Sequence, residues 1–438
     1  MNRKCCSLVG SYLTLLKPLL IRGVLRRLEQ KHKGIERTLA IQDQSGITQT
    51  DQASISEVFA QFYEHLYRDT TVPIEPPLKE AANEGVTEAE LRQALRQLKG
   101  GKTGADDGLV AEMLKTGHAH LVCVIAEFFS QILNGALEPP EEWKLTKFRV
   151  LFKKGDPSLP KNYRPIAILP VMAKLFSTVL YNRLAATIDS KLSKEQFGFR
   201  PKRGCADAIH IVRTVIEKSL EWGEELWVAT LDVEKAFDRV HHSALFSALL
   251  DSGISISTVC VLRRLYHGVR GYVSLWDGAE SRPFDVQRGV KQGDPLSPAL
   301  FNLVLDKVLS EVSSTWNRRG YGTLVGQSIN GKCLTHVAFA DDQTLIARSW
   351  ISMKRMILML RDALAKVGLD LHPTKCKVQT NRTEFTRRGA VVLTEGFSIE
   401  ILEPGEHLEL LGTSVSLEDP TGQEVENRIA CVLCKTWV

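Results

Sequence analysis

The segment that most constrains the fold is His336–Arg348, which reads HVAFADDQTLIAR. Apolar residues alternate before Ala340, two acids follow it, and apolar residues then resume. This pattern predicts a strand, a tight turn and a second strand, with Asp341 and Asp342 at the tip of the hairpin. Because the alternation of side chains breaks at a turn, both carboxylates can project into one site, where a bound cation relieves their repulsion. A single Asp-Asp pair is also common turn chemistry, so the hairpin alone assigns no function.

A third acid lies near the end of another predicted strand. Leu226–Val233 is a nearly continuous apolar run, typical of a buried central strand, and it contains Asp232. A buried carboxylate without a partner is costly, although an Asp at a strand end is common. Phe237 follows five residues after Asp232 and can form a wall of the same site.

Gln287–Ser297 is a loop punctuated by glycines that leads into a helix predicted over Leu296–Val312. Gly289 and Gly293 carry no side chain, so the loop backbone can lie flat against a base or a sugar. Asp294 is predicted to cap the helix, with a proline next to it in the first turn.

Positive charge is unevenly distributed along the chain, whose net charge is only +5. Residues 144–203 contain 14 Lys and Arg but 3 Asp and Glu, which suits a polyanion such as nucleic acid, with a solvated basic surface as the alternative. Within this block, Glu195–Gly204 interleaves aromatic and basic residues, a composition that suits base stacking and phosphate binding. An exposed turn with buried Phe side chains fits that segment equally well.

The nine cysteines are scattered and mostly lie in apolar patterns, which favours a reduced, intracellular protein over a disulfide framework. Cys431 and Cys434 form a C-x-x-C without a second pair, so helix packing is favoured there over a zinc site. No segment has the ~18 uninterrupted apolar residues that a membrane span needs. We therefore predict no transmembrane segment, and the N-terminal apolar run lacks a signal-peptide cleavage pattern.

Several motifs occur in a fixed order: DVEKAFDRV, QRGVKQGDPLSPALFNLVL and AFADD. Together they resemble reverse transcriptases, most closely those of non-LTR (LINE-type) retrotransposons. FKKGDPSLPKNYRPIAILPVMAKLFSTVLYNRL resembles the first finger block of that family, and QFGFRPKRGCADAI resembles the second. GLDLHPTKCKV is similar to the motif after the catalytic hairpin, and LELLGTSV to the grip hairpin. The resemblance extends over roughly residues 25–436.

The resemblance implies an α+β right-hand polymerase with fingers, a palm and a truncated thumb, preceded by a mainly helical N-terminal extension. We expect the extension and a linker in residues 1–84 and the fingers in 85–225. The palm is expected in 226–415, with 265–295 returning to the fingers and the glycine-punctuated loop, and the start of the thumb in 416–438.

The implied function is an RNA-directed DNA polymerase that extends a primer 3′-hydroxyl by two-metal nucleotidyl transfer. Asp232, Asp341 and Asp342 match the catalytic triad and are expected to bind two Mg²⁺, with Mn²⁺ as a substitute. The backbone carbonyl of Val233 is expected to complete a ligand set. The expected partners are an RNA template, a DNA primer and dNTPs, with no membrane and no small-molecule cofactor.

The resemblance also implies a set of nucleotide-binding residues: Lys153, Arg164, Val233, Phe237, Gln292, Gly293 and Lys375. Lys153 and Arg164 match positions that bind the triphosphate, and Phe237 matches an aromatic gate that would clash with a ribose 2′-hydroxyl. Lys375 is expected to donate a proton to pyrophosphate. Template contacts are expected from Phe197, Arg200, Lys202 and Arg203.

Two departures from the family pattern and the end of the chain favour an alternative. His372 stands where the family usually has Asn, and Leu411 where an aromatic residue is common. The chain stops at Val438, in what resembles the first thumb helix, so most of the thumb is expected to be absent. The alternative is a catalytically silent nucleic-acid-binding remnant of such an element.

Other polymerases are less compatible with these motifs. Phe-Ala-Asp-Asp in place of Gly-Asp-Asp, together with the bulky Phe237, disfavours an RNA-templated RNA polymerase. The segments before the fingers favour the LINE type over maturase or telomerase kinship. By family resemblance the protein is expected in the cytoplasm and nucleus.

Overall fold

The computed structural model describes residues 40–69, 83–102, 107–324, 333–372, 374–382, 384, 389–403 and 405–417 of the 438-residue chain. Most of the expected N-terminal extension and thumb, and the Cys431–Cys434 pair, lie outside the described residues. The chain divides into two compact units, which are described separately. The first contains residues 1–182, 255–287 and 292–295, and the second contains 183–254, 288–291 and 296–438.

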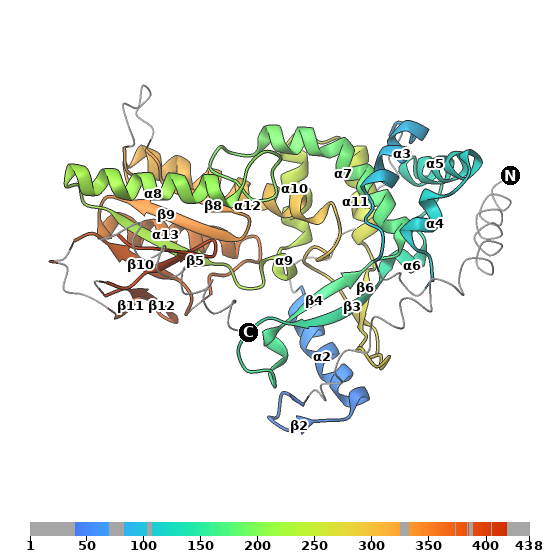
Figure 1. The fold of residues 1–438 in the computed structure, drawn as a ribbon, viewed down its shortest axis with the longest axis horizontal. Helices are drawn as coiled ribbons and strands as arrows, with labels where there is room; N and C mark the ends of the chain where they lie inside the picture. Colours follow the sequence, from blue (N-terminus) through green and yellow to red (C-terminus); the bar gives the residue numbers. More distant parts are fainter. Residues whose placement is uncertain are drawn as a thin grey trace, which may run out of the picture. The chain divides into compact units, whose positions relative to one another are not determined.

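The first unit combines helices with two small sheets (Figure 1). Its elements are β1 (Ile41–Gln42), β2 (Thr48–Gln49), α2 (Gln52–Tyr67), α3 (Glu88–Gln97), α4 (Ala111–Lys115), α5 (Ala119–Leu133), α6 (Glu141–Lys144), β3 (Leu145–Phe152), the 3₁₀ helix η1 (Pro160–Asn162), β4 (Tyr163–Ile168), α11 (Ile256–Tyr266), β6 (Arg270–Val273) and β7 (Phe284–Asp285). The long helix α7 (Val171–Lys191) begins in the first unit and ends in the second.

The four-stranded sheet of the first unit has the order β4-β3-β6-β7, in which β3 and β6 are parallel and the other pairs are antiparallel. An aromatic face of α2 packs on this sheet: Tyr67 stacks on Phe148 with ring centroids 5.6 Å apart, and Phe148 stacks on Phe284 at 6.1 Å. Side chains on alternate positions of β3 are buried in this core, which explains the period-2 pattern of its sequence.

Helix α3 shows how local sequence sets a boundary in this unit. The Thr87 side chain accepts a hydrogen bond from the Glu90 N–H, and the Glu90 carboxylate accepts one from the Thr87 N–H. This reciprocal capping box satisfies two backbone donors that the first turn leaves free. The Thr-x-x-Glu spacing of the sequence therefore marks the start of this helix.

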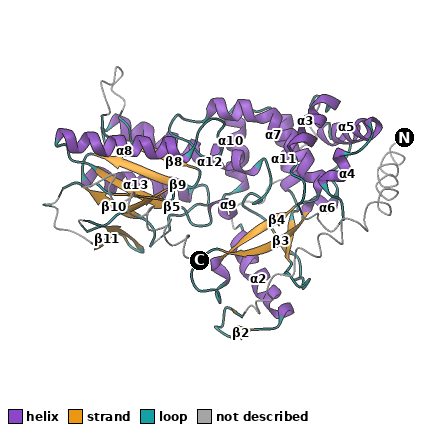
Figure 2. Ribbon diagram, viewed as in Figure 1, coloured by secondary structure: helices purple, strands orange, loops and turns teal. Residues whose placement is uncertain are grey.

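The second unit is built on a six-stranded sheet with helices against it (Figure 2). Its elements are α8 (Cys205–Trp222), β5 (Trp227–Asp232), α9 (Ala236–Arg239), α10 (His242–Asp251), α12 (Ser297–Arg318), β8 (His336–Phe339), β9 (Asp342–Ala347), α13 (Trp350–Ala365), β10 (Lys377–Thr380), β11 (Gly389–Thr394), β12 (Phe397–Ile401), β13 (Leu408–Leu410) and β14 (Thr413–Val415). The last two strands form a separate hairpin.

The large sheet has the strand order β11-β12-β10-β5-β9-β8, so β5 lies inside it and β8 lies at an edge. β5 is antiparallel to both β9 and β10. Its apolar residues are almost completely buried, which confirms the central strand predicted from the apolar run. One core cluster joins α8 to this sheet and to the β13–β14 hairpin, through residues such as Val212, Ile346 and Leu408.

Of two predictions about the elements, the structure confirms one and contradicts the other. The mixed α+β composition is confirmed, but the cap predicted for α12 is wrong. That helix begins at Ser297 with Leu296 at the N-cap and without a side-chain cap. The Asp294 carboxylate instead accepts a hydrogen bond from the Ser177 hydroxyl, far away in the sequence.

Two further properties concern the described cysteines and helices. All five cysteines that the structure describes are free thiols. None of the described helices has both the length and the apolarity needed to cross a membrane.

Candidate active site

The acidic hairpin forms as predicted. β8 and β9 pair antiparallel, and the pair Phe339–Asp342 closes a turn made of Ala340 and Asp341. Ala340 has a φ of 52°, in the left-handed region that non-glycine residues rarely adopt. Asp342 is the first residue of β9, so the two acids lie one in the turn and one at the strand end.

Strand register brings the third acid to this place. In the β5–β9 pair, Asp232 lies directly opposite Asp342. Directly opposed residues of an antiparallel pair project to the same face of the sheet, with their Cα atoms ~4.5–5.5 Å apart. Asp341 precedes Asp342 in the turn. The two neighbouring strands therefore carry three carboxylates to one end of the sheet.

A positive charge faces these acids. The Lys375 Nζ lies 2.8 Å from an Asp232 carboxylate oxygen, and the two side chains are 37% and 29% exposed. Lys375 precedes β10, which pairs with β5 on the side opposite β9. Like charges directly opposite each other destabilise a sheet, and the ammonium offsets that repulsion.

The chemistry of these side chains fits a cation, but they are not gathered around one. Within the described ranges, no group of three or more His, Cys, Asp or Glu side chains is arranged to hold a metal ion. Carboxylate oxygens are the ligands that Mg²⁺ prefers, and an ammonium already lies against Asp232. A metal ion bound at these carboxylates would share Asp232 with Lys375.

The backbone that follows Asp232 is held by the segment after α13. The His372 N–H donates to the Asp232 carbonyl at 2.8 Å, and the Glu234 N–H donates to the Asp370 carbonyl at 2.8 Å. Arg239 bridges the carboxylates of Glu234 and Asp370, each at 2.7 Å. Sequence reasoning missed this arginine because the bridge joins segments 131 residues apart. His372 acts here through its backbone.

Phe237 lies in an aromatic cluster. Its ring stacks on Phe301 with centroids 4.6 Å apart and meets Phe199 edge-on at 6.1 Å. Its carbonyl accepts a hydrogen bond from the Val290 N–H at 2.7 Å. A Cβ on Gly289 would come within 2.6 Å of the Asp238 carbonyl oxygen, so the glycine-punctuated loop depends on glycine for this close approach.

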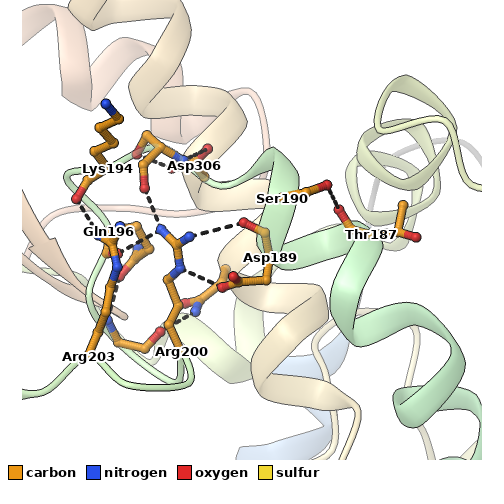
Figure 3. A network of polar contacts seen from close by, with 11 residues as sticks. Thr187, Asp189, Ser190, Lys194, Gln196, Arg200, Arg203 and Asp306 are labelled. Carbon is orange, nitrogen blue, oxygen red and sulfur yellow. Dashed lines mark hydrogen bonds and ion pairs between the residues drawn. The ribbon is translucent and has the colours of Figure 1, made fainter.

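The four residues expected to contact a template differ in accessibility. Phe197 is only 7% exposed, with the Arg203 guanidinium over its ring. Arg200 is also buried, because its guanidinium binds Asp189 and backbone carbonyls (Figure 3). Lys202 is exposed. The exposed aromatic residue of this segment is Phe199, at 55%, which the sequence analysis did not select.

Four further expected residues lie in the first unit, whereas Val233 lies in the second and forms an antiparallel bridge with Leu371. Lys153 and Arg164 are exposed on the β3–β4 hairpin. The Gln292 carbonyl accepts a hydrogen bond from the Ala167 N–H at 2.9 Å. Gly293 has a φ of 115°, and a Cβ there would lie 2.9 Å from the Ala167 carbonyl oxygen. The loop residues Gln292 and Gly293 therefore lie against strand β4 within the first unit.

Comparison with known proteins gives consistent matches. Residues 152–397 match the family described as "Reverse transcriptase (RNA-dependent DNA polymerase)". The Pol polyprotein of the type-2 retrotransposable element R2DM from Drosophila melanogaster is 35% identical over 238 residues, which cover 54% of this chain and 21% of that protein. The Pol polyprotein of a type-1 element R2 from Popillia japonica is 31% identical, covering 54% and 32%.

A third relative is the RNA-directed DNA polymerase of the mobile element jockey from Drosophila funebris. It is 22% identical over 293 residues, which cover 66% of this chain and 31% of that protein. The chain therefore spans between about a fifth and a third of the length of these relatives.

Proposed function

The chain belongs to the reverse transcriptase (RNA-dependent DNA polymerase) family, and from this we propose that it is the polymerase part of a non-LTR retrotransposon protein, which extends a DNA primer on an RNA template. The observation that carries the proposal is the strand register that places Asp232 opposite Asp342, next to Asp341 in the turn. The relatives are named as retrotransposon polymerases and polyproteins of the same kind.

The three acids are proposed to hold two Mg²⁺ ions, with Mn²⁺ as a substitute and the Val233 carbonyl as a further ligand. When bound, such ions activate the primer 3′-hydroxyl and stabilise the leaving pyrophosphate. A further role is proposed for Lys375. Lys375, which pairs with Asp232, would release that carboxylate to a bound ion and is proposed to donate a proton to pyrophosphate.

Further residues are proposed to contact the nucleotide and the template. Lys153 and Arg164 supply positive charge and a guanidinium fork for the triphosphate. Gln292 and Gly293 present backbone to the nucleotide, and Phe237 excludes a ribose 2′-hydroxyl. At the template, the burial of Phe197 and Arg200 leads us to assign the contacts to Phe199, Lys202 and Arg203.

A silent nucleic-acid-binding remnant is the second candidate. It is favoured by the Lys375–Asp232 ion pair, which neutralises the acid that a catalytic metal would need. In that case the basic side chains bind nucleic acid, and no nucleotide is incorporated.

Primer extension distinguishes the two. The wild type is expected to extend oligo(dT) on poly(rA) with Mg²⁺, whereas Asp341→Ala and Asp342→Ala reduce extension to background. Asp251→Ala is the matched control, because Asp251 is an acid of the same unit that pairs with Lys307 rather than with the site. Salt-sensitive duplex binding by a folded wild type that does not extend would favour the remnant.

A further inference from the structure

We propose that Gln196 and Gln343 are positioning residues that fix the backbone of the Ala340–Asp341 turn, from which Asp341 would reach a metal ion; this rests on the proposed polymerase function. The Gln196 Oε1 accepts a hydrogen bond from the Ala340 N–H at 3.0 Å. The Gln343 Nε2 donates to the Ala340 carbonyl at 2.8 Å. Both glutamines are buried, with 0% and 1% exposure, so two amide side chains fix the peptide groups on both sides of Ala340.

The turn needs such support because of its backbone conformation. Ala340 has a φ of 52°, in the left-handed region that is unfavourable for a residue with a Cβ. Such a residue keeps this conformation only where its surroundings determine it. The Ala340 carbonyl belongs to the peptide group that leads into Asp341, so the hydrogen bond from Gln343 sets the direction in which Asp341 leaves the turn.

Gln196 reaches the turn because its own backbone lies along the edge strand β8. The Ala338 N–H donates to the Glu195 carbonyl at 2.9 Å, and the Phe197 N–H donates to the Ala338 carbonyl at 2.8 Å. These bonds cover part of an edge that would otherwise present unpaired backbone groups. They also place the Gln196 side chain beside the tip of the hairpin.

The next residue but one, Gly198, packs directly under the same turn. A Cβ on Gly198 would come within 2.3 Å of the Ala340 nitrogen. Its N–H donates to the Gln196 Oε1 at 2.9 Å, and its carbonyl accepts a hydrogen bond from Asn302 of α12 at 2.6 Å. The turn is therefore held against a glycine backbone that is itself bonded to α12.

A polar network anchors the segment that carries Gln196 (Figure 3). The Arg200 guanidinium donates to the Gln196 carbonyl at 3.1 Å and to the Asp189 carboxylate at 2.7 Å. The Asp306 carboxylate of α12 accepts a hydrogen bond from the Ser193 N–H at 3.0 Å. In the segment around Gln196, some residues are exposed to solvent, whereas the buried residues support the acidic turn.

Two Gln→Glu substitutions test the proposal. Both add a buried carboxyl group, but the native Gln196 side chain accepts its hydrogen bond from the turn, whereas the native Gln343 side chain donates one. Gln196→Glu keeps an oxygen that can accept the two N–H groups. Gln343→Glu replaces the donor with an oxygen that faces the Ala340 carbonyl. We expect Gln343→Glu to raise the dissociation constant for Mn²⁺, measured by electron paramagnetic resonance, by roughly 10- to 100-fold, and Gln196→Glu to raise it much less.

Methionine variants remove each hydrogen bond without much change in volume. Gln196→Met and Gln343→Met are both expected to weaken Mn²⁺ binding to a similar extent and to lower kcat for single-nucleotide incorporation, with KM for dNTP close to that of the wild type. Gln379→Met is the matched control. Gln379 is a buried glutamine of the same unit that also bonds backbone on both sides, at Glu406 and Leu417. It should lose stability but keep the wild-type Mn²⁺ affinity.

Two results would overturn the inference in distinguishable ways. If the wild type extends primers and the Gln196 and Gln343 variants bind Mn²⁺ as tightly as Gln379→Met, the glutamines do not position the turn and the proposed function stands. If a folded wild type neither binds Mn²⁺ nor extends primers, the proposed function and the inference are both wrong. The Gln→Glu pair decides the matter even if a methionine variant fails to fold.

Discussion

At the scale of single residues, Lys375 forms an ion pair with the proposed metal ligand Asp232. Its ammonium lies 2.8 Å from the carboxylate, and the strand partner of Asp232 is a second acid, Asp342. Because two opposed acids repel each other, the lysine stabilises the sheet end while no metal is bound. We infer that the same contact opposes metal binding, since the ammonium occupies one of the two carboxylate oxygens of Asp232.

We predict opposite effects of Lys375→Met with and without Mg²⁺. Without Mg²⁺, the variant should lose up to about 1 kcal/mol of unfolding free energy, because half-exposed ion pairs contribute little. With saturating Mg²⁺, it should gain more stability than the wild type, because the competing ammonium is gone. Thermal unfolding with and without Mg²⁺ measures both effects.

Lys307→Met provides the control for this prediction. Lys307 forms an ion pair with Asp251 in the same unit and is likewise 37% exposed. Its loss should lower stability equally at all Mg²⁺ concentrations. An identical Mg²⁺-dependent shift for the wild type and Lys375→Met would contradict competition at Asp232.

At the scale of single elements, strand β8 depends on a neutral histidine. His336 is fully enclosed, and its ring meets Trp316 of α12 edge-on at 5.9 Å. Burial lowers the pKa of His336 from 6.5 to about 4, because the interior disfavours the charged imidazolium. Its Nδ1 lies 3.0 Å from the Thr335 hydroxyl. The edge strand next to the acidic turn is therefore sensitive to acid.

This pKa shift predicts a pH-dependent stability. The pKa of His336 is lower in the folded state than in the unfolded state, so the unfolded chain binds the proton more readily. The contribution is complete above pH 6.5 and is lost as the pH falls toward 4, by about 3 kcal/mol in total. His336→Phe keeps a ring against Trp316 but cannot titrate. Urea unfolding across this interval should therefore show a steeper loss for the wild type, and parallel curves would contradict the prediction.

The elements differ in how far the sequence predicts them. Period-2 alternation and apolar runs predicted the β8–β9 hairpin and β5, because burial of one or both faces dictates those patterns. The cap of α12 was predicted wrongly, since the Asp294 carboxylate is taken by Ser177, a partner that no local pattern reveals. Likewise, the spacing of Phe197 and Phe199 would place both on one face of an extended segment. Phe197 is nevertheless buried and Phe199 exposed, because Phe199 has a left-handed backbone with a φ of 53°.

The sequence selected the three acids that the structure brings together, but not the residues that hydrogen-bond the turn between them. The motifs selected Asp232, Asp341 and Asp342, and strand pairing then placed Asp232 opposite Asp342. Register between strands 110 residues apart depends on the whole sheet, so no local signal could supply it. Gln196 and Gln343 were missed for the same reason, because their hydrogen bonds to the turn exist only after β8, α12 and the segment around Gly198 have packed together.

At the scale of the whole molecule, residues 144–203 contain more Lys and Arg side chains than are available to contact a nucleic acid. Of the 14 Lys and Arg in residues 144–203, several are used inside the protein. Lys147 pairs with Glu280, Arg149 bonds backbone carbonyls and lies over Trp276, and Arg200 is buried against Asp189. Net charge counted along the sequence therefore overstates the number of phosphates that the protein can neutralise.

The salt dependence of binding should separate exposed from internal basic residues. Each phosphate contact releases counterions, so its loss reduces the slope of log K against log salt by about 1. Lys202 is exposed, and Lys202→Ala should reduce the slope for an RNA–DNA duplex by that amount while leaving stability unchanged.

Arg200→Ala should instead lower stability, because Asp189 and three backbone carbonyls lose their donor. The folded fraction of this variant should keep the wild-type slope. Fluorescence anisotropy over a series of salt concentrations, with unfolding measured in parallel, tests both variants. A reduced slope for Arg200→Ala with unchanged stability would show that its guanidinium is available to the nucleic acid, and the division between exposed and internal charge would then be wrong.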